Sequence, residues 1–156
     1  MTITRAQCEV ILTRRRGLVM TRIGLDGTTT SGANLDLGDP IAFAIRQLGY
    51  GVTDPTNPAD ADLAPVDQTT IDELLDVAEW RVLLSCLGNA ARVTQQGGTD
   101  KIDYTDLITE LRQQFKDLTD SLKLAYGLGL QSLTAGVIDL GFQATDDAEA
   151  LAQIFN

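Results

Sequence analysis

The side chains that most often carry out catalysis are scarce in this chain of 156 residues, which contains no histidine and two cysteines. Ser31 lies in a glycine-rich loop, residues 24–38, but no imidazole exists to activate it as a nucleophile. The same loop contains no lysine, whereas a phosphate-binding P-loop ends in Gly-Lys-Ser/Thr. The sequence therefore lacks the usual serine-hydrolase and nucleotide-binding arrangements.

Carboxylates are the remaining candidates for acid–base chemistry or metal binding. Glu73, Asp76 and Glu79 recur at steps of three, a spacing that is more typical of a solvated helix face than of a catalytic pair. The stretch 60–65, DADLAP, offers two aspartates but lacks the glycine and the final bidentate glutamate of a calcium loop. We therefore predict no catalytic residue, no metal site and no cofactor, and we expect that the protein is not an enzyme.

Composition places the chain among globular proteins that can bury a core. Hydrophobic residues make up 44% of the 156 positions, and the mean hydropathy is zero. The sequence contains no apolar run as long as a membrane span and does not start with a charged and then apolar signal segment. We expect synthesis in the cytosol and no membrane partner.

The charge is unevenly distributed along the chain, whose net charge is −10 and whose pI is about 4.2. The first 23 residues contain five arginines and one glutamate, whereas residues 39–79 contain nine acidic residues and one arginine. Such an acidic block repels nucleic acid and favours a basic neighbour. We expect it to contribute to a negative surface that does not bind nucleic acid.

Three consecutive arginines, Arg14, Arg15 and Arg16, lie in the middle of the first predicted helix. Consecutive positions fan across most of a helix circumference, so at least one must lie near the packed side. Their stems could cover apolar surface while the charged ends stay in water, which is the reading we favour. The alternative is that these arginines contact an acidic partner.

Both cysteines lie on apolar stripes of predicted helices. A small buried thiol is the common explanation for cysteine in that setting, and a disulfide or a reactive thiol is rare. We therefore expect Cys8 and Cys86 to be core residues.

Helical periodicity predicts a mainly α fold, a bundle of about four helices with two irregular connectors. The connector 50–67 contains three of the four prolines and is expected to have no regular core of its own. The predicted helices span residues 4–23, 39–48, 70–87 and 103–126.

Local signals set the predicted helix ends. Asp39 followed by Pro40 has the pattern of an N-cap and first helical position. Thr70 and Glu73 have the spacing of a capping box, and Gly88 is the expected end of that helix.

The last long predicted helix has the strictest periodicity. Its apolar residues step alternately by four and three, which predicts a narrow seam that packs along one other helix, in the same chain or in a neighbouring copy. The seam residues are Tyr104, Ile108, Leu111, Phe115, Leu118 and Leu122.

After Gly127 the helical period is lost, so we divide the chain into a helical domain, 1–127, and a C-terminal part, 128–156, which contains a docking arm, 130–142, and a short helix. Residues 138–143 alternate apolar and other residues like a half-buried strand, and a lone strand needs a partner for its backbone groups. The arm therefore either pairs with another protein or lies over the helices as an extended tail. The arm residues of interest are Leu130, Leu133, Val137, Ile138, Leu140 and Phe142.

A short amphipathic helix is predicted after the arm. Thr145 has the pattern of an N-cap, and acidic residues follow in the first turn. Its apolar stripe consists of Ala148, Leu151, Ala152 and Phe155.

The order of these parts resembles the head–tail connector (adaptor) proteins of tailed bacteriophages. The resemblance covers residues 5–142 and includes the phrases DPIAFAIRQLG and LLDVAEWRVL. It implies a structural virion protein of the neck, made in the host cytoplasm, that forms a ring of typically twelve copies beneath the portal protein and receives a tail or stopper protein. It also implies that the helical bundle forms the ring wall, while the arm docks on the portal. The terminal helix 145–155 departs from the family pattern, which leaves its role open.

Two other readings stay open at this level. The chain could be a different phage neck or tail-completion protein. A small helical nucleic-acid-binding module is a weaker alternative, because a net charge of −10 opposes the phosphate contacts that dominate such binding.

Overall fold

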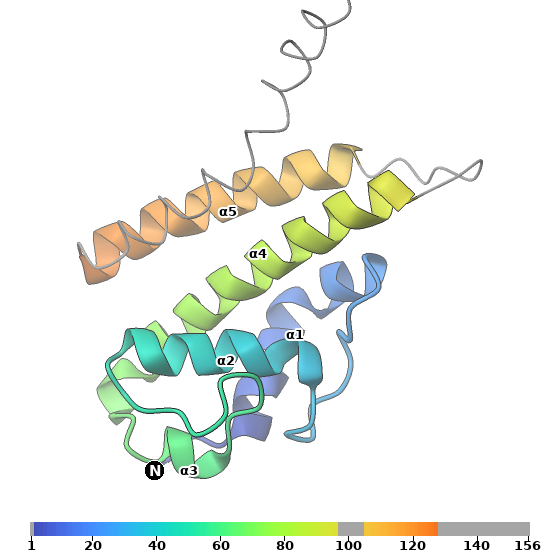
Figure 1. The fold of residues 1–156 in the computed structure, drawn as a ribbon. Coiled ribbons are helices and arrows are strands. Elements are labelled where there is room, and N and C mark those ends of the chain that lie inside the picture. Colours follow the sequence, from blue (N-terminus) through green and yellow to red (C-terminus); the bar gives the residue numbers. More distant parts are fainter. Residues whose placement is uncertain (1, 97–104, 128–156) are drawn as a thin grey trace, which may run out of the picture. The chain divides into compact units, whose positions relative to one another are not determined.

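A computed structural model describes residues 2–96 and 105–127 of the chain, and these residues are mainly helical (Figure 1). The predicted fold class, a mainly α helical bundle, is confirmed. The predicted arm, 130–142, and the predicted terminal helix, 145–155, lie outside the described residues. In chain order the elements are α1 (Arg5–Arg22), α2 (Leu35–Gln47), α3 (Asp60–Leu63), the 3-10 helix η1 (Gln68–Thr70), α4 (Ile71–Gln96) and α5 (Thr105–Tyr126).

The chain divides after Leu118 into two compact units, residues 1–118 and 119–156. The first unit contains α1 to α4 and the first part of α5, and it holds the features described below.

Helix α1 begins and ends close to where its sequence predicts. Thr4 is the N-cap and forms a capping box with Gln7, in which each side chain accepts a hydrogen bond from the other residue's backbone N–H. Gly24 follows the C-cap with φ = +79°, a conformation that favours glycine.

Helix α2 starts earlier than predicted, at Leu35 rather than after Asp39. Asn34 is the N-cap, because its side-chain oxygen accepts hydrogen bonds from the backbone N–H groups of Asp36 and Leu37. Pro40 therefore lies inside the helix, in its second turn, and not at its first position. Asp39 and Pro40 looked like a helix start, but the better-placed cap lies five residues upstream.

Helix α4 differs from the prediction at both ends. Asp67 caps the preceding 3-10 turn, and the Thr70 hydroxyl donates to the Asp67 carbonyl (2.9 Å) instead of capping α4 itself. The helix also continues through Gly88 to Gln96. A glycine inside a helix costs only about 1 kcal/mol, which the packing of the next turn offsets, since Ala90 is fully buried.

The connector 50–67 has more structure than its sequence predicts. It contains the one-turn helix α3, and Leu63 and Val66 are buried in the core. These two side chains join the core of the long helices and do not form a separate core within the connector.

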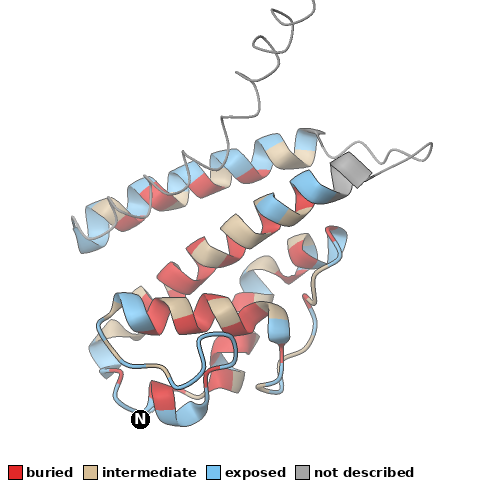
Figure 2. Cartoon of the chain, in the orientation of Figure 1, coloured by how far each residue is buried: buried red, intermediate tan, exposed pale blue. Residues whose placement is uncertain are grey.

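The core lies where α1 and α2 pack against α4, and the buried positions in Figure 2 follow the facing sides of these helices. Trp80 of α4 is 2% exposed, stacks with Phe43 of α2 at a ring-centroid distance of 6.1 Å, and contacts Phe115 of α5 at 5.0 Å. Besides Trp80, the largest fully buried apolar side chains of the first unit are Leu12, Met20, Ile23, Leu37, Ile41, Ile45, Leu63, Leu74, Leu83 and Leu111.

The loop between α1 and α2 packs directly against the backbone of α1. A Cβ atom on Gly17 would collide with the carbonyl oxygen of Gly27, so this close approach requires glycine on both sides. The loop is thereby held along α1, which places Asn34 for the contacts described next.

Candidate interaction surface

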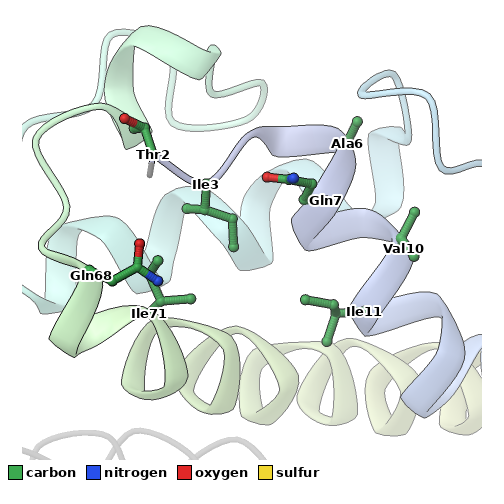
Figure 3. Close-up of a pocket in the computed structure, with 8 residues that line it drawn as sticks. All are labelled: Thr2, Ile3, Ala6, Gln7, Val10, Ile11, Gln68 and Ile71. Carbon is green, nitrogen blue, oxygen red and sulfur yellow. The ribbon is translucent and has the colours of Figure 1, made fainter.

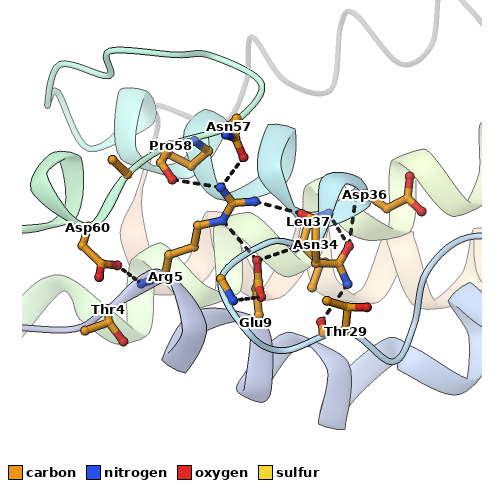
Figure 4. Close-up of polar contacts among 12 residues, drawn as sticks. Thr4, Arg5, Glu9, Thr29, Asn34, Asp36, Leu37, Asn57, Pro58 and Asp60 are labelled. Carbon is orange, nitrogen blue, oxygen red and sulfur yellow. Dashed lines mark hydrogen bonds and ion pairs between the residues drawn. The ribbon is translucent and has the colours of Figure 1, made fainter.

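Arg5, in the first turn of α1, is a buried arginine whose guanidinium is surrounded by acceptors (Figure 4). Its Nε donates to Glu9 Oε1 at 3.1 Å, one helical turn away, and this ion pair has side-chain exposures of 6% and 0%. The two terminal nitrogens donate to the Asn34 carbonyl (3.0 Å), to the Pro58 carbonyl (3.1 Å) and to Asn57 Oδ1.

Glu9 completes this cluster by accepting from the loop that precedes α2. Its two carboxylate oxygens accept the backbone N–H groups of Gly32 (2.6 Å) and Asn34 (3.0 Å). The Asn34 side chain donates in turn to the carbonyls of Asp26 and Thr29. The buried Arg5–Glu9 pair therefore fixes two loops, 26–34 and 57–60, to the start of α1.

The chemistry of this buried pair is structural. A buried charge pair is tolerated when its remaining donors and acceptors are satisfied, and both loops supply such partners here.

A second ion-pair network joins the C-terminal half of α1 to α4 and α5. Arg15 donates to Asp76 and Glu79, both at 2.8 Å, and Arg16 donates to the other oxygen of Glu79 at 2.7 Å. Arg16 also donates to Gln114 Oε1 of α5 at 2.5 Å. Burial opposes charge on Arg15, but the hydrogen bonds to the two carboxylates outweigh it and raise the pKa of Arg15 above its ordinary value.

Of the three consecutive arginines, two are thus engaged within the chain, and Arg14 is exposed. Arg15 and Arg16 thus contact acidic residues, as in the alternative reading, but these residues belong to α4 of the same chain and not to a separate partner. Glu79 is only 8% exposed, so the interpretation of Glu73, Asp76 and Glu79 as a solvated face is wrong for Glu79.

Several carboxylates of the acidic block 39–79 stabilise local structure. Asp62 accepts from the Thr53 hydroxyl (2.7 Å) and from the Ala59 N–H (2.8 Å), and these hydrogen bonds lower the pKa of Asp62. The backbone and hydroxyl of Thr56 likewise lower the pKa of Asp54. Asp39 pairs with Arg81 at 2.9 Å. Arg81 therefore partly neutralises the charge of Asp39, whereas Asp54 and Asp62 remain negatively charged.

The residues of the predicted seam on α5 differ in how far they are buried. Leu111, Phe115 and Leu122 are buried, at 0%, 8% and 2% exposure. Ile108 and Leu118 are half-buried, and Tyr104 lies outside the described residues. Within the first unit, Phe115 packs against Trp80 of α4.

Cys8 and Cys86 are free thiols with no exposed surface, as the sequence predicts. Burial raises the pKa of each thiol to about 12. Both are core residues and poor nucleophiles at neutral pH.

An apolar groove of about 460 Å³ opens between the start of α1 and the start of α4 (Figure 3). Ile3, Ile11 and Ile71 point into the space between these elements, and Ile11 and Ile71 are half-buried. The complete lining is Thr2, Ile3, Ala6, Gln7, Val10, Ile11, Gln68 and Ile71.

The groove offers surface for binding and few groups for catalysis. Its polar side chains are two glutamines and a threonine, none of which is an effective acid or base at neutral pH. An open apolar groove of this kind suits an apolar peptide segment.

Searches for metal-ligand clusters and membrane-spanning helices, confined to the described residues, find neither. Comparison of the chain with protein-family models, curated proteins and solved structures finds no match.

The sequence reasoning missed the Arg5–Glu9 pair and the groove. Arg5 and Glu9 are four residues apart on a helix, which is the spacing of an ion pair, but that spacing does not reveal burial. Val10 and Ile11 widen the apolar surface of α1 beyond its core-facing stripe, and this was the available signal for the groove.

Proposed function

We propose that the chain is a structural subunit of a head–tail connector in a tailed bacteriophage, assembling as a ring beneath the portal protein. The observation that carries this proposal is the order and length of the helices. The chain has an 18-residue α1 and a shorter α2, then the connector that Arg5 holds, and then two helices of 26 and 22 residues. The family resemblance implies this order.

The way the described unit uses its polar groups also supports an assembly role. Its buried charges hold loops and helices of the subunit together, whereas an apolar groove is left open at the surface. Such a unit provides a rigid body with binding surface, which suits a component of a wall more than an enzyme.

In this proposal the ring meets the portal through the arm 130–142, and a tail or stopper protein binds beneath it. The arm residues Ile138, Leu140 and Phe142 would fill alternate pockets on the portal, as added strands do. DNA passes through the ring without specific binding, in a virion neck.

The test is the mass of the purified protein, alone and mixed with portal rings encoded by the same genome, measured by light scattering after size-exclusion chromatography. Twelve subunits of 16.8 kDa give a ring of about 200 kDa, which should co-elute with the portal. The variant Leu140→Asp should keep its helical content and lose portal binding.

Two results would contradict the proposal. One is a wild-type protein that does not bind the portal at any accessible concentration. The other is specific binding to duplex DNA, tighter than the roughly micromolar limit of non-specific binding at physiological salt.

A further inference from the structure

The open groove beside α1 has a matching occupant in the sequence of the chain itself. The last described residue is Gly127, and 29 residues follow it. Within them, residues 145–156 have the pattern of a short amphipathic helix whose stripe is Ala148, Leu151, Ala152 and Phe155.

We propose that the groove between α1 and α4 binds residues 145–156 of a second copy of the chain. This inference rests on the proposed function and deepens it, because it names the contact that links neighbouring subunits. It also assigns a role to the segment that has no counterpart in the connector pattern.

The dimensions of the two partners agree. From Ala148 to Phe155 a helix rises by about 10 Å. The groove is lined by α1 from Ala6 to Ile11, a rise of about 8 Å, and by Thr2 and Ile3 before the helix. Leu151 and Phe155 are large enough to fill the space into which Ile3, Ile11 and Ile71 point.

The charges define the direction of binding. Exposed Arg14 lies one turn beyond Val10 and Ile11, at one end of the groove. Exposed Asp67 and Asp72 flank Gln68 and Ile71, at the other end. The segment is acidic at its start, where Asp146, Asp147 and Glu149 lie, and uncharged from Ala150 onward. The acidic start of the segment should therefore lie at the end of the groove near Arg14, and its uncharged end near Asp67 and Asp72.

The linking chain is long enough to reach a neighbour. Residues 128–144 number 17 and extend to at most about 55 Å. A unit of this size is roughly 35 Å across. A contact in which one surface donates a segment and a different surface accepts it is heterologous, which is the kind of contact that builds rings when its rotation closes.

The test combines two full-length variants that each lose one half of the contact. Val10→Glu places a carboxylate in the groove and leaves the segment intact, whereas Leu151→Asp alters the segment and leaves the groove intact. Each variant alone should associate at least about tenfold more weakly than wild type in sedimentation velocity. An equimolar mixture should form a 1:1 dimer and nothing larger, because one chain can only donate and the other can only accept.

Matched controls separate this contact from general effects of added charge. Leu124→Asp changes a side chain that is 90% exposed on α5 and should leave self-association within about twofold of wild type. Ala6→Glu gives a second groove variant in case Val10→Glu does not fold, as judged by circular dichroism. Arg14→Glu should weaken self-association several-fold, whereas Arg112→Glu on α5 should not.

Self-association of Leu151→Asp at the wild-type level would overturn the inference, and so would a variant mixture that stays monomeric. Portal binding distinguishes these failures from failure of the proposed function. If Leu151→Asp still forms rings and binds the portal, the groove contact is wrong and the connector function stands. If the mixture dimerises but the wild-type protein does not bind the portal, the groove contact stands and the connector function is wrong.

Discussion

The two ion-pair networks of α1 use the same residue types at very different depths. At the start of the helix, Arg5 and Glu9 are 6% and 0% exposed and hold two loops. Toward its end, Arg15 and Arg16 are 36% and 20% exposed and connect α1 to neighbouring helices. If the first network is broken, a charge and several backbone groups are left buried without hydrogen-bond partners. In the second network, water can replace part of the lost hydrogen bonds. We therefore expect the burial of each network, more than its number of contacts, to decide how much it contributes to the free energy of unfolding.

The largest effect is expected from Glu9→Ala. The substitution leaves the Arg5 guanidinium buried without its carboxylate and removes the acceptor of two loop N–H groups. We expect a loss of about 3–5 kcal/mol in the free energy of unfolding, measured by urea denaturation. Asp120→Ala, at an exposed position of α5, is the control and should change it by less than about 0.5 kcal/mol. Similar losses in the two variants would show that the buried pair does not dominate.

A comparable effect is expected from alkaline pH, because one buried thiol lies beside each network. Burial is the main effect on the pKa of both thiols; Asp60 and, less strongly, Glu9 also raise the pKa of Cys8, whereas Arg16 lowers that of Cys86. Burial raises both folded-state pKa values to about 12, whereas an unfolded thiol ionises near 9. The unfolded state therefore loses protons first, and stability falls as the pH rises above about 9.

At pH 10 the expected loss is about 1.4 kcal/mol per thiol, or about 3 kcal/mol for both. Urea denaturation at pH 8 and pH 10 measures it. The double variant Cys8→Ala, Cys86→Ala is the control and should have a much smaller pH dependence, whatever its stability at pH 8. An unchanged pH dependence in that variant would assign the effect to other groups.

A smaller effect is expected from Glu79→Gln in the second network. The substitution keeps the size of the side chain but removes the charge that Arg15 and Arg16 share. Because both arginines retain access to water, we expect a loss of only about 1–2 kcal/mol in the free energy of unfolding. Glu73→Gln, half-exposed on the same helix, is the matched control. A loss as large as that of Glu9→Ala would mean that exposure does not separate the networks.

The same contrast explains what the sequence could predict. The long helices were predictable, because periodicity and the Thr4 and Gly24 signals are local properties of the chain. The burial of Glu9 was not, because the groups that bury it and satisfy it come from a loop more than twenty residues away. A charged pair at helical spacing has the same sequence pattern whether it lies in water or in a core.

Helix ends show the same limit. The start of α2 at Asn34 depends on a side chain held by the loop as well as by the helix, so the stronger local pattern at Asp39 was misleading. The end of α4 depends on packing beyond Gly88, which outweighs the helix-ending preference of glycine. The groove was not predictable either, since it exists only where the start of α1 meets the start of α4.

The smallest effect is expected for the outermost pair, Arg15 with Asp76, whose side chains are 36% and 31% exposed. A double-mutant cycle with Arg15→Ala and Asp76→Ala isolates their coupling, since each variant also changes other contacts. We expect a coupling energy of about 0.2–1 kcal/mol at low salt, and nearly none in 1 M NaCl, where the screening length falls to about 3 Å. The Arg5–Glu9 pair provides the internal comparison, because salt cannot enter a site that is closed to water and its contribution should persist. A coupling energy between Arg15 and Asp76 that exceeds 2 kcal/mol and persists in 1 M NaCl would contradict this comparison. The exposed network would then be as strong as the buried one, and burial would not explain their energies.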